Sequence, residues 1–321
     1  MRLDGSDDHV KLPDNLLAGL TSITISAEVL VRAAQGTPYF IYGFGNTDAA
    51  GVGNGYLYST GNAYKTSIAS GNWSTEQTAN SSANLERDVW KTITYTLDDA
   101  TDTARVYLDG VQVAQNTAVT ITPGSIGGGV TTANHLGRSV YDADKRLAGD
   151  LRDVRIYDAA LSATEVSALV PTDETRLQRD AAALSLGDLS GLTANLSLPA
   201  KGANGAAITW GSSDPAVISA TGAVTRPVAG QTPAEVTLTA TLARGSASAT
   251  RAFTATVLPS PAATRSLRPT STRSRSPAHR TCGATSRCPQ RARSTEATSP
   301  GPLRRRASSR PARRAASRQG S

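Results

Sequence analysis

The chain of 321 residues is long enough for two or three domains of roughly 100–200 residues each. Its net charge of +7 is unevenly distributed: residues 1–258 hold 18 Lys and Arg against 25 Asp and Glu, and residues 259–321 hold 15 Arg against one acid. Both cysteines lie in this last segment, which excludes a disulfide framework or a cysteine metal site elsewhere. We expect no membrane span and no signal peptide, because the chain lacks both a long apolar run and a basic, then apolar, N-terminus.

The composition favours β-structure, since seven Glu, five Lys and one Met stand beside 28 Gly and many Thr, Val and Ser. In Leu20–Arg32, apolar residues occupy every odd position from Ile23 to Val31, which predicts a strand with one buried face. Further short runs predict the remaining strands of a sandwich or barrel: Tyr39–Phe44, Tyr56–Ser59, Val89–Leu97, Ala104–Leu108, Val111–Val113, Val119–Ile121 and Leu151–Tyr157. The Gly-rich stretches Gly43–Gly55 and Gly127–Gly129 are expected to be loops.

Two local signals are specific. Asp109-Gly110 separates two short apolar runs and predicts a two-residue hairpin turn, because both residues readily adopt a positive φ. Ser162 and Glu165 have capping-box spacing and predict a short helix that ends before Pro171. This helix closes the first predicted domain, residues 1–170.

Residues 171–179 are rich in charge and are predicted to be a linker with some helical tendency. A second set of short apolar or alternating runs follows, and over residues 180–258 it predicts a small Ig-like sandwich. These runs are Ala206–Trp210, Ala216–Ser219, Ala223–Arg226, Val236–Leu242 and Ser246–Val257.

Residues 259–321 contain no Ile, Val, Phe, Tyr, Trp or Met, so we predict that this Arg/Ser/Pro-rich tail is disordered. Its residue types are those that GC-rich codons encode when read out of frame, and a frameshift is our preferred explanation. A genuine basic tail is the alternative. Translating the other reading frames after codon 258 distinguishes the two.

Five blocks of the first domain resemble the laminin-G-like, concanavalin-A-like jelly-roll family: Leu3–Pro13, Trp90–Leu97, Val106–Val113, His135–Arg138 and Gly149–Ser162. The resemblance implies an all-β, two-sheet jelly roll with a concave face suited to an extended sugar chain. Ile208–Ser219, followed by Gly222–Thr225 and Val236–Thr241, resembles the atrophied bacterial Ig-like domain.

This pair of domains is similar to accessory regions of secreted bacterial glycoside hydrolases of the arabinofuranosidase type. The resemblance implies a non-catalytic carbohydrate-binding or spacer module, a monomeric fragment of an extracellular enzyme that acts on plant cell-wall polysaccharide. Two alternatives stay open: a cell-surface adhesion or protein-interaction module, and nucleic-acid association through the basic tail. The tail has no Lys and no aromatic residue for base stacking, which argues against nucleic acid.

Sugar rings pack their apolar face on aromatic side chains, so loop aromatics are candidate ligand contacts. Trp73 lies in a polar loop and is the first candidate, with Tyr56, Tyr58 and Tyr64 nearby in the sequence. The alternative is that these rings fold back onto their own sandwich. Trp90 and Trp210 start or lie within apolar runs and are predicted to be core residues.

Calcium is a possible cofactor, because hard cations prefer carboxylate and carbonyl oxygens. Asp4, Asp7 and Asp8 are the candidate ligands, with Asp153 in the segment where related domains often supply another Asp; turn-forming, solvated aspartates are the alternative reading. No Glu-x-Asp-x-x-Glu array is present, so we expect no catalysis by this domain. A zinc site is not expected, because His9 and His135 lie far apart in the sequence without a third ligand.

Overall fold

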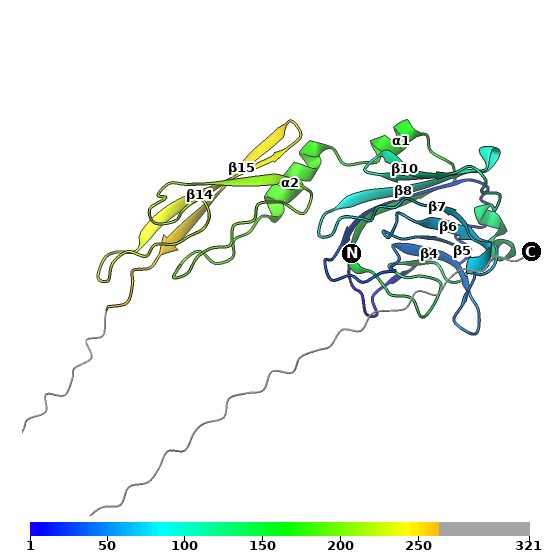
Figure 1. Ribbon diagram of the computed structural model, residues 1–321, viewed down its shortest axis with the longest axis horizontal. Helices are drawn as coiled ribbons and strands as arrows, with labels where there is room; N and C mark the ends of the chain where they lie inside the picture. The colour runs from blue at the N-terminus through cyan, green and yellow to red at the C-terminus, as the bar shows by residue number, and fades with distance from the viewer. Residues whose placement is uncertain (263–321) are drawn as a thin grey trace, which may run out of the picture. The chain divides into compact units, whose positions relative to one another are not determined.

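The computed structural model describes residues 1–262 and contains three antiparallel sheets, so the predicted all-β class is confirmed (Figure 1). The first sheet consists, in spatial order, of β1 (Arg2–Asp4), β12 (Ala148–Tyr157), β3 (Ile23–Val31), β8 (Lys91–Asp98), β9 (Thr103–Leu108) and β10 (Val111–Asn116). The second consists of β2 (Val10–Lys11), β11 (His135–Leu136), β4 (Tyr42–Thr47), β5 (Gly53–Ser59), β6 (Thr66–Ala69) and β7 (Gln77–Ala79). Three short 3-10 turns lie between these strands: η1 (Trp73–Thr75), η2 (Asp99–Thr101) and η3 (Pro123–Gly129).

The two six-stranded sheets enclose one hydrophobic core, to which β3 contributes its odd-numbered residues and β5 contributes Leu57. The expectation that β3 has one buried face was wrong, because all nine of its residues are buried. Polar side chains at its even-numbered positions are hydrogen-bonded: Ser26 bonds Thr94 on the neighbouring strand β8 (2.9 Å), and Thr24 donates to the carbonyl of Ala159 (2.7 Å). A polar face can be buried when its groups are hydrogen-bonded in this way.

The predicted Asp109-Gly110 turn and the predicted capping box are both confirmed. Strands β9 and β10 form a hairpin in which Leu108 pairs with Val111, and Asp109 and Gly110 have φ values of 49° and 80°. Helix α1 (Ala163–Ala168) begins at a complete capping box between Ser162 and Glu165.

The expectation of a loop at Gly43–Gly55 holds only for residues 48–52, because the remaining residues form most of β4 and the start of β5. Gly45 pairs with Tyr56 across the two strands, and a Cβ at position 45 would overlap the backbone of both Gly55 and Tyr56. The glycine here serves the close approach of two strands, which composition alone does not distinguish from loop flexibility. Residues 127–129 fall within η3 and have positive φ.

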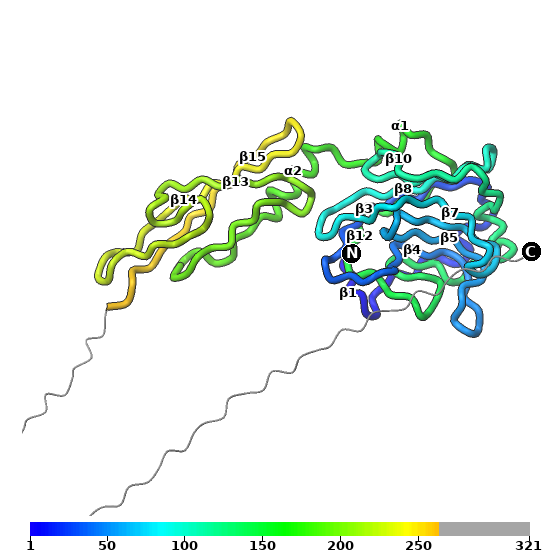
Figure 2. The backbone as a smooth tube through the Cα atoms, in the orientation of Figure 1, coloured from blue at the N-terminus to red at the C-terminus, as the bar shows by residue number. Residues whose placement is uncertain are grey.

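The third sheet has the order β13 (Ala207–Ser212), β14 (Ala234–Arg244) and β15 (Ala247–Val257), and β14 and β15 run side by side along their length (Figure 2). The runs predicted as strands at 216–219 and 223–226 meet in a single bridge, Ile218 with Val224. The sheet is covered on one side by irregular extended segments that pack Leu192 and its neighbours against Val236 and Val257.

Residues 171–179 were predicted to be a linker with some helical tendency; most of them belong to a regular helix, α2 (Asp173–Ala183), and do not form a linker. The helix packs on β14 and β15, and Leu177 is fully buried in the core of the third sheet. Only two apolar side chains of this helix, Leu177 and Ala181, join that core, so the charged residues dominated the sequence pattern.

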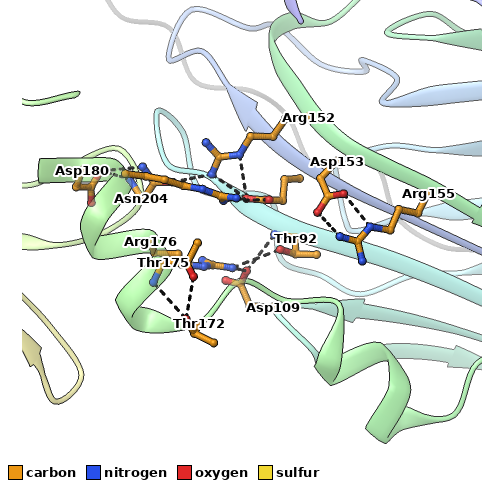
Figure 3. Close-up of polar contacts among 12 residues, drawn as sticks. Thr92, Asp109, Arg152, Asp153, Arg155, Thr172, Thr175, Arg176, Asp180 and Asn204 are labelled. Atoms are coloured by element: carbon orange, nitrogen blue, oxygen red, sulfur yellow. Dashed lines mark hydrogen bonds and ion pairs between the residues drawn. The ribbon is translucent and has the colours of Figure 1, made fainter. Parts of the chain in front are cut away.

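Polar contacts join α2 and the 202–204 turn to the first sheet (Figure 3), and the described residues belong to one compact unit. Glu28 on β3, with a side chain 3% exposed, accepts hydrogen bonds from Arg152 on β12 (2.7 Å) and from Arg179 on α2 (2.9 Å). Arg176 donates to Asp109 in the hairpin turn (2.6 Å). Asn204 accepts from Arg152 (2.7 Å) and donates to Asp180 (2.9 Å).

Trp90 belongs to this junction and not to the sandwich core, where it was predicted. Its ring lies under the guanidinium of Arg152, 3.8 Å from the ring centroid, and its backbone N–H donates to the carbonyl of Ala203 (2.8 Å). Trp210 packs partly buried against both apolar clusters of the third sheet, as expected for a core residue.

The predictions made for residues 259–321 fall almost wholly on residues 263–321, which lie outside the described part of the chain. Within residues 1–262, no helix has the length and apolar character needed to cross a membrane.

Candidate functional site

The candidate site lies on the face of the second sheet that points away from the sandwich core. Alternation along β5 places Tyr56 and Tyr58 on this face and Leu57 in the core. Their partners on β4 are Gly45 and Gly43, which have no side chains to separate the rings. The two tyrosine rings therefore stack, with centroids 5.7 Å apart.

Two further rings from outside β5 complete this aromatic layer. Phe40 meets Tyr58 edge to face at 5.1 Å, and Tyr141 meets Tyr56 edge to face at 5.5 Å. Tyr141 lies against Gly53, where a Cβ would overlap its ring. The absence of a side chain at position 53 is therefore what allows Tyr141 to lie on the sheet.

Trp73 stands at the edge of the layer with 71% of its surface exposed. It begins the turn η1, which Asn72 caps by accepting from the N–H of Ser74 (3.0 Å). The backbone N–H of Trp73 donates to the hydroxyl of Tyr141 (2.9 Å). The backbone of an exposed indole is thus anchored, while its ring stays free for a ligand.

A pocket of about 190 Å³ opens between these side chains. It is lined by Phe40, Tyr58, Trp73, Glu76, Tyr141 and Asp144. The lining combines aromatic surface with two carboxylates, which is a composition that suits small polar ligands with an apolar face.

Glu76, 13% exposed, organises the floor of the site. Its Oε1 accepts from the hydroxyl of Tyr56 (2.9 Å), and its Oε2 accepts from Tyr58 (3.0 Å) and from the ammonium of Lys65 (2.6 Å). Burial raises the pKa of Tyr58 to about 12 and also raises that of Tyr56. Burial works to lower the pKa of Lys65, but its hydrogen bonds to Glu76 and Tyr58 raise it overall. Lys65 therefore stays charged and the tyrosines stay neutral near pH 7.

Of the four aromatic residues selected from the sequence, Trp73 and Tyr58 line the pocket. Tyr56 lies in the same aromatic layer but is fully buried, so the expectation that it contacts the ligand was wrong. Tyr64 lies elsewhere, because its ring packs in the sandwich core and its hydroxyl donates to the carbonyl of Asn84 (3.0 Å). The positive φ of 42° at Tyr64 marks a turn between β5 and β6 that directs this ring into the core.

Sequence reasoning missed Phe40, Glu76, Tyr141 and Asp144. Glu76 follows Trp73 by three residues in the same polar segment, which is a signal that could have been used. Tyr141 and Asp144 come from a loop about 70 residues further along the chain, and only the pairing of β11 with β4 brings that loop to the site.

The N-terminal aspartates also meet: Asp4, Asp7 and Asp8 each place a carboxylate oxygen within 4.8 Å of the others. All three are exposed. The backbone N–H of Ser6 donates to Asp4 (2.7 Å) and holds the pKa of that carboxyl below its usual range. Asp153 is not part of this group, because both of its oxygens accept from Arg155 on the same strand (2.7 and 2.8 Å).

His9 and His135 meet although they are distant in the sequence, with ring centroids 5.1 Å apart in an edge-to-face arrangement. His135 is 8% exposed, and burial lowers its pKa to about 4, assisted by the charge of Arg138. Asp4, Asp7 and Asp8 are the only set of three potential metal ligands found within residues 1–262, so the histidine pair gains no third ligand there.

Comparison with protein families agrees with this architecture. Residues 4–167 match the model of the concanavalin A-like lectin/glucanases superfamily, and the chain belongs to that superfamily. Residues 177–260 match the model of the atrophied bacterial Ig domain. A search of curated proteins found no match.

Several solved structures are similar to parts of the chain. Domain 4 of AbnA, an extracellular GH43 arabinanase from Geobacillus stearothermophilus in complex with arabinotriose, is 19% identical over 53% of this chain and 80% of that chain, with a TM-score of 0.40. The CBM40 of the Ruminococcus gnavus IT-sialidase, bound to alpha2,3 sialyllactose, is 17% identical over 51% of this chain and 97% of that chain, also with a TM-score of 0.40. The NanB sialidase from Streptococcus pneumoniae is 13% identical over 79% of this chain and 38% of that chain, with a TM-score of 0.42.

Proposed function

We propose that this chain is a non-catalytic carbohydrate-binding module. The observation that carries the proposal is the aromatic pocket on the second sheet, where an exposed, backbone-anchored Trp73 stands beside Tyr58 and Glu76. A sugar ring can stack its C–H face on the indole while its hydroxyls reach the carboxylates. Membership of a superfamily of lectins and glucanases is consistent with this role.

The chemistry of Glu76 favours binding over catalysis. A glycosidase needs one carboxylate that is free to attack or to activate water, and a second that is protonated near the working pH. Glu76 already accepts three hydrogen bonds, one of them from the ammonium of Lys65, and these hold its carboxyl group in place. Its role in the proposed site is to orient two tyrosines.

We further propose that the module belongs to a larger extracellular enzyme that degrades polysaccharides of the plant cell wall, and that it acts as a monomer. The order of the two domains, a jelly roll followed by an atrophied Ig domain, supports this reading. The Ig-like part then serves as a spacer that presents the sugar-binding face.

Calcium is proposed as a ligand of the aspartate loop. Three carboxylate oxygens within 4.8 Å suit a hard cation, and the lowered pKa of Asp4 keeps that carboxylate ionised. Asp4, Asp7 and Asp8 would hold the ion, and its contribution there would be to cross-link the N-terminal turn. Asp153 is left out of the proposed ligand set because Arg155 occupies it.

Titration calorimetry of the full chain against arabinotriose, xylotriose and cellotriose tests the function. We expect binding of at least one of these sugars, and we expect Trp73→Ala to weaken it about tenfold or more by removing the stacking surface. Tyr64→Phe is a matched control, since its hydroxyl bonds Asn84 away from the pocket. Equal affinity of Trp73→Ala and wild type would contradict the proposal, and so would the release of reducing ends from a polysaccharide by the purified chain.

A further inference from the structure

The tyrosine hydroxyls around the pocket all donate their protons to other groups of the protein. Tyr56 gives its single hydroxyl proton to Glu76 (2.9 Å), so at the 3.2 Å contact between Tyr56 and Tyr141 the proton belongs to Tyr141. Tyr141 in turn accepts from the backbone N–H of Trp73 (2.9 Å), and Tyr58 donates to Glu76 (3.0 Å). The hydroxyl protons of all three tyrosines are therefore used within the wall of the site.

What the wall leaves for a ligand is acceptor capacity. A carboxylate offers about four lone-pair sites, and Glu76 uses three of them on Tyr56, Tyr58 and Lys65. Asp144 supplies a second carboxylate to the same lining. A ligand that fills this pocket must bring hydrogen-bond donors for these two carboxylates, while the indole N–H of Trp73 remains as a single neutral side-chain donor.

The charged residues of the lining also favour a ligand without negative charge. Glu76 and Asp144 are its two charged residues, and no Lys or Arg lines the pocket within residues 1–262. Lys65, which lies outside the lining, is already paired with Glu76 at 2.6 Å. Burial raises the pKa of Asp144, a hydrogen bond with Ser139 opposes the rise, and the charge of Glu76 adds to it.

We infer that the pocket selects uncharged sugar residues, which donate hydrogen bonds through their hydroxyls, and excludes sugars that carry carboxylate, sulfate or phosphate groups. An anionic group would meet the like charges of Glu76 and Asp144, and no positively charged side chain of the lining would offset them; the indole N–H of Trp73 is a neutral donor. This inference rests on the proposed function and specifies its ligand class.

The test compares uncharged and acidic glycans on the full chain. Arabinotriose, xylotriose and cellotriose are the uncharged probes, and trigalacturonate and sialyllactose are the acidic ones. We expect every acidic probe to bind at least about tenfold more weakly than the best uncharged probe. We also expect binding of the uncharged probe to change little with salt, because no ion pair forms.

Asp144→Asn separates charge from shape. The variant keeps the size of the side chain but removes one of the two negative charges, so the ratio of uncharged to acidic affinity should fall severalfold. Asp142→Asn is the matched control: Asp142 lies two residues away, pairs with Arg138 and does not line the pocket. Its ratio should equal that of the wild type.

The possible failures are distinguishable. Acidic probes that bind as tightly as uncharged ones would overturn this inference and leave the carbohydrate-binding function standing. An unchanged ratio in Asp144→Asn would also overturn it. No binding of any probe, and no signal on a broad glycan array, would overturn the proposed function itself.

Discussion

The buried carboxylate of Glu28 offers the most quantitative prediction. It accepts two hydrogen bonds from Arg152 on β12 (3.0 and 2.7 Å) and two from Arg179 on α2 (3.1 and 2.9 Å). The substitution Glu28→Gln keeps the size of the side chain but leaves two guanidinium groups without their counter-charge. The contacts at stake are those that hold α2 on the first sheet.

The magnitude follows from burial. Breaking a fully buried ion pair by removing one partner costs about 3–5 kcal/mol. The side chains of Arg152 and Arg179 are 27% and 35% exposed, so water recovers part of this cost. We expect Glu28→Gln to lower the free energy of unfolding by about 2–3 kcal/mol, which for a chain of this size lowers Tm by roughly 5–10 °C.

The assay is urea denaturation and scanning calorimetry of the full chain. Asp153→Asn is the matched control, because Asp153 pairs with Arg155 on the exposed side of the same strand β12 and should cost less than about 0.5 kcal/mol. A double-mutant cycle with Arg179→Met should give a coupling energy of about 1 kcal/mol or more. If Glu28→Gln costs no more than the control, the reasoning about this junction is refuted.

Three further predictions test the site and its surroundings. Gly53→Ala should displace the ring of Tyr141, cost about 1–3 kcal/mol of stability and weaken glycan binding. The control Gly211→Ala, whose added Cβ meets no close atom, should change neither stability nor binding. Glycan binding that survives Gly53→Ala contradicts the packing argument. His135 is held neutral with a pKa of about 4, so unfolding takes up a proton, and the free energy of unfolding should fall by up to about 3 kcal/mol as the pH falls from about 6.5 to 4. Urea titrations of His135→Asn should show a weaker dependence of stability on pH. A dependence identical to that of the wild type would disprove the assignment. Calcium at about a hundredfold excess over its Kd should raise the free energy of unfolding by about 2.7 kcal/mol, and a chelator should reverse this effect. Asp8→Asn should abolish the stabilisation by calcium, and Asp153→Asn should retain it. Stabilisation that persists in Asp8→Asn counts against the aspartate site.

The features that were predictable from the sequence are those governed by neighbours in the chain. The Asp109-Gly110 turn depends on two backbone φ angles, and the capping box of α1 depends on two side chains three residues apart. Tyr56 and Tyr58 share a face because strands alternate with a period of two. Each of these needs only a few consecutive residues, so the local sequence was sufficient.

Tertiary structure decided what depends on residues distant in the chain. The pocket needs Tyr141 and Asp144 beside Glu76, and nothing in the local sequence of that loop specifies a distance to β5. Helix α2 looked like a linker because its charged residues, Arg176 and Arg179, find their counter-charges on the first sheet. From the sequence alone, charged residues are interpreted as solvent-exposed, because a charge is buried only when a partner distant in the chain compensates it.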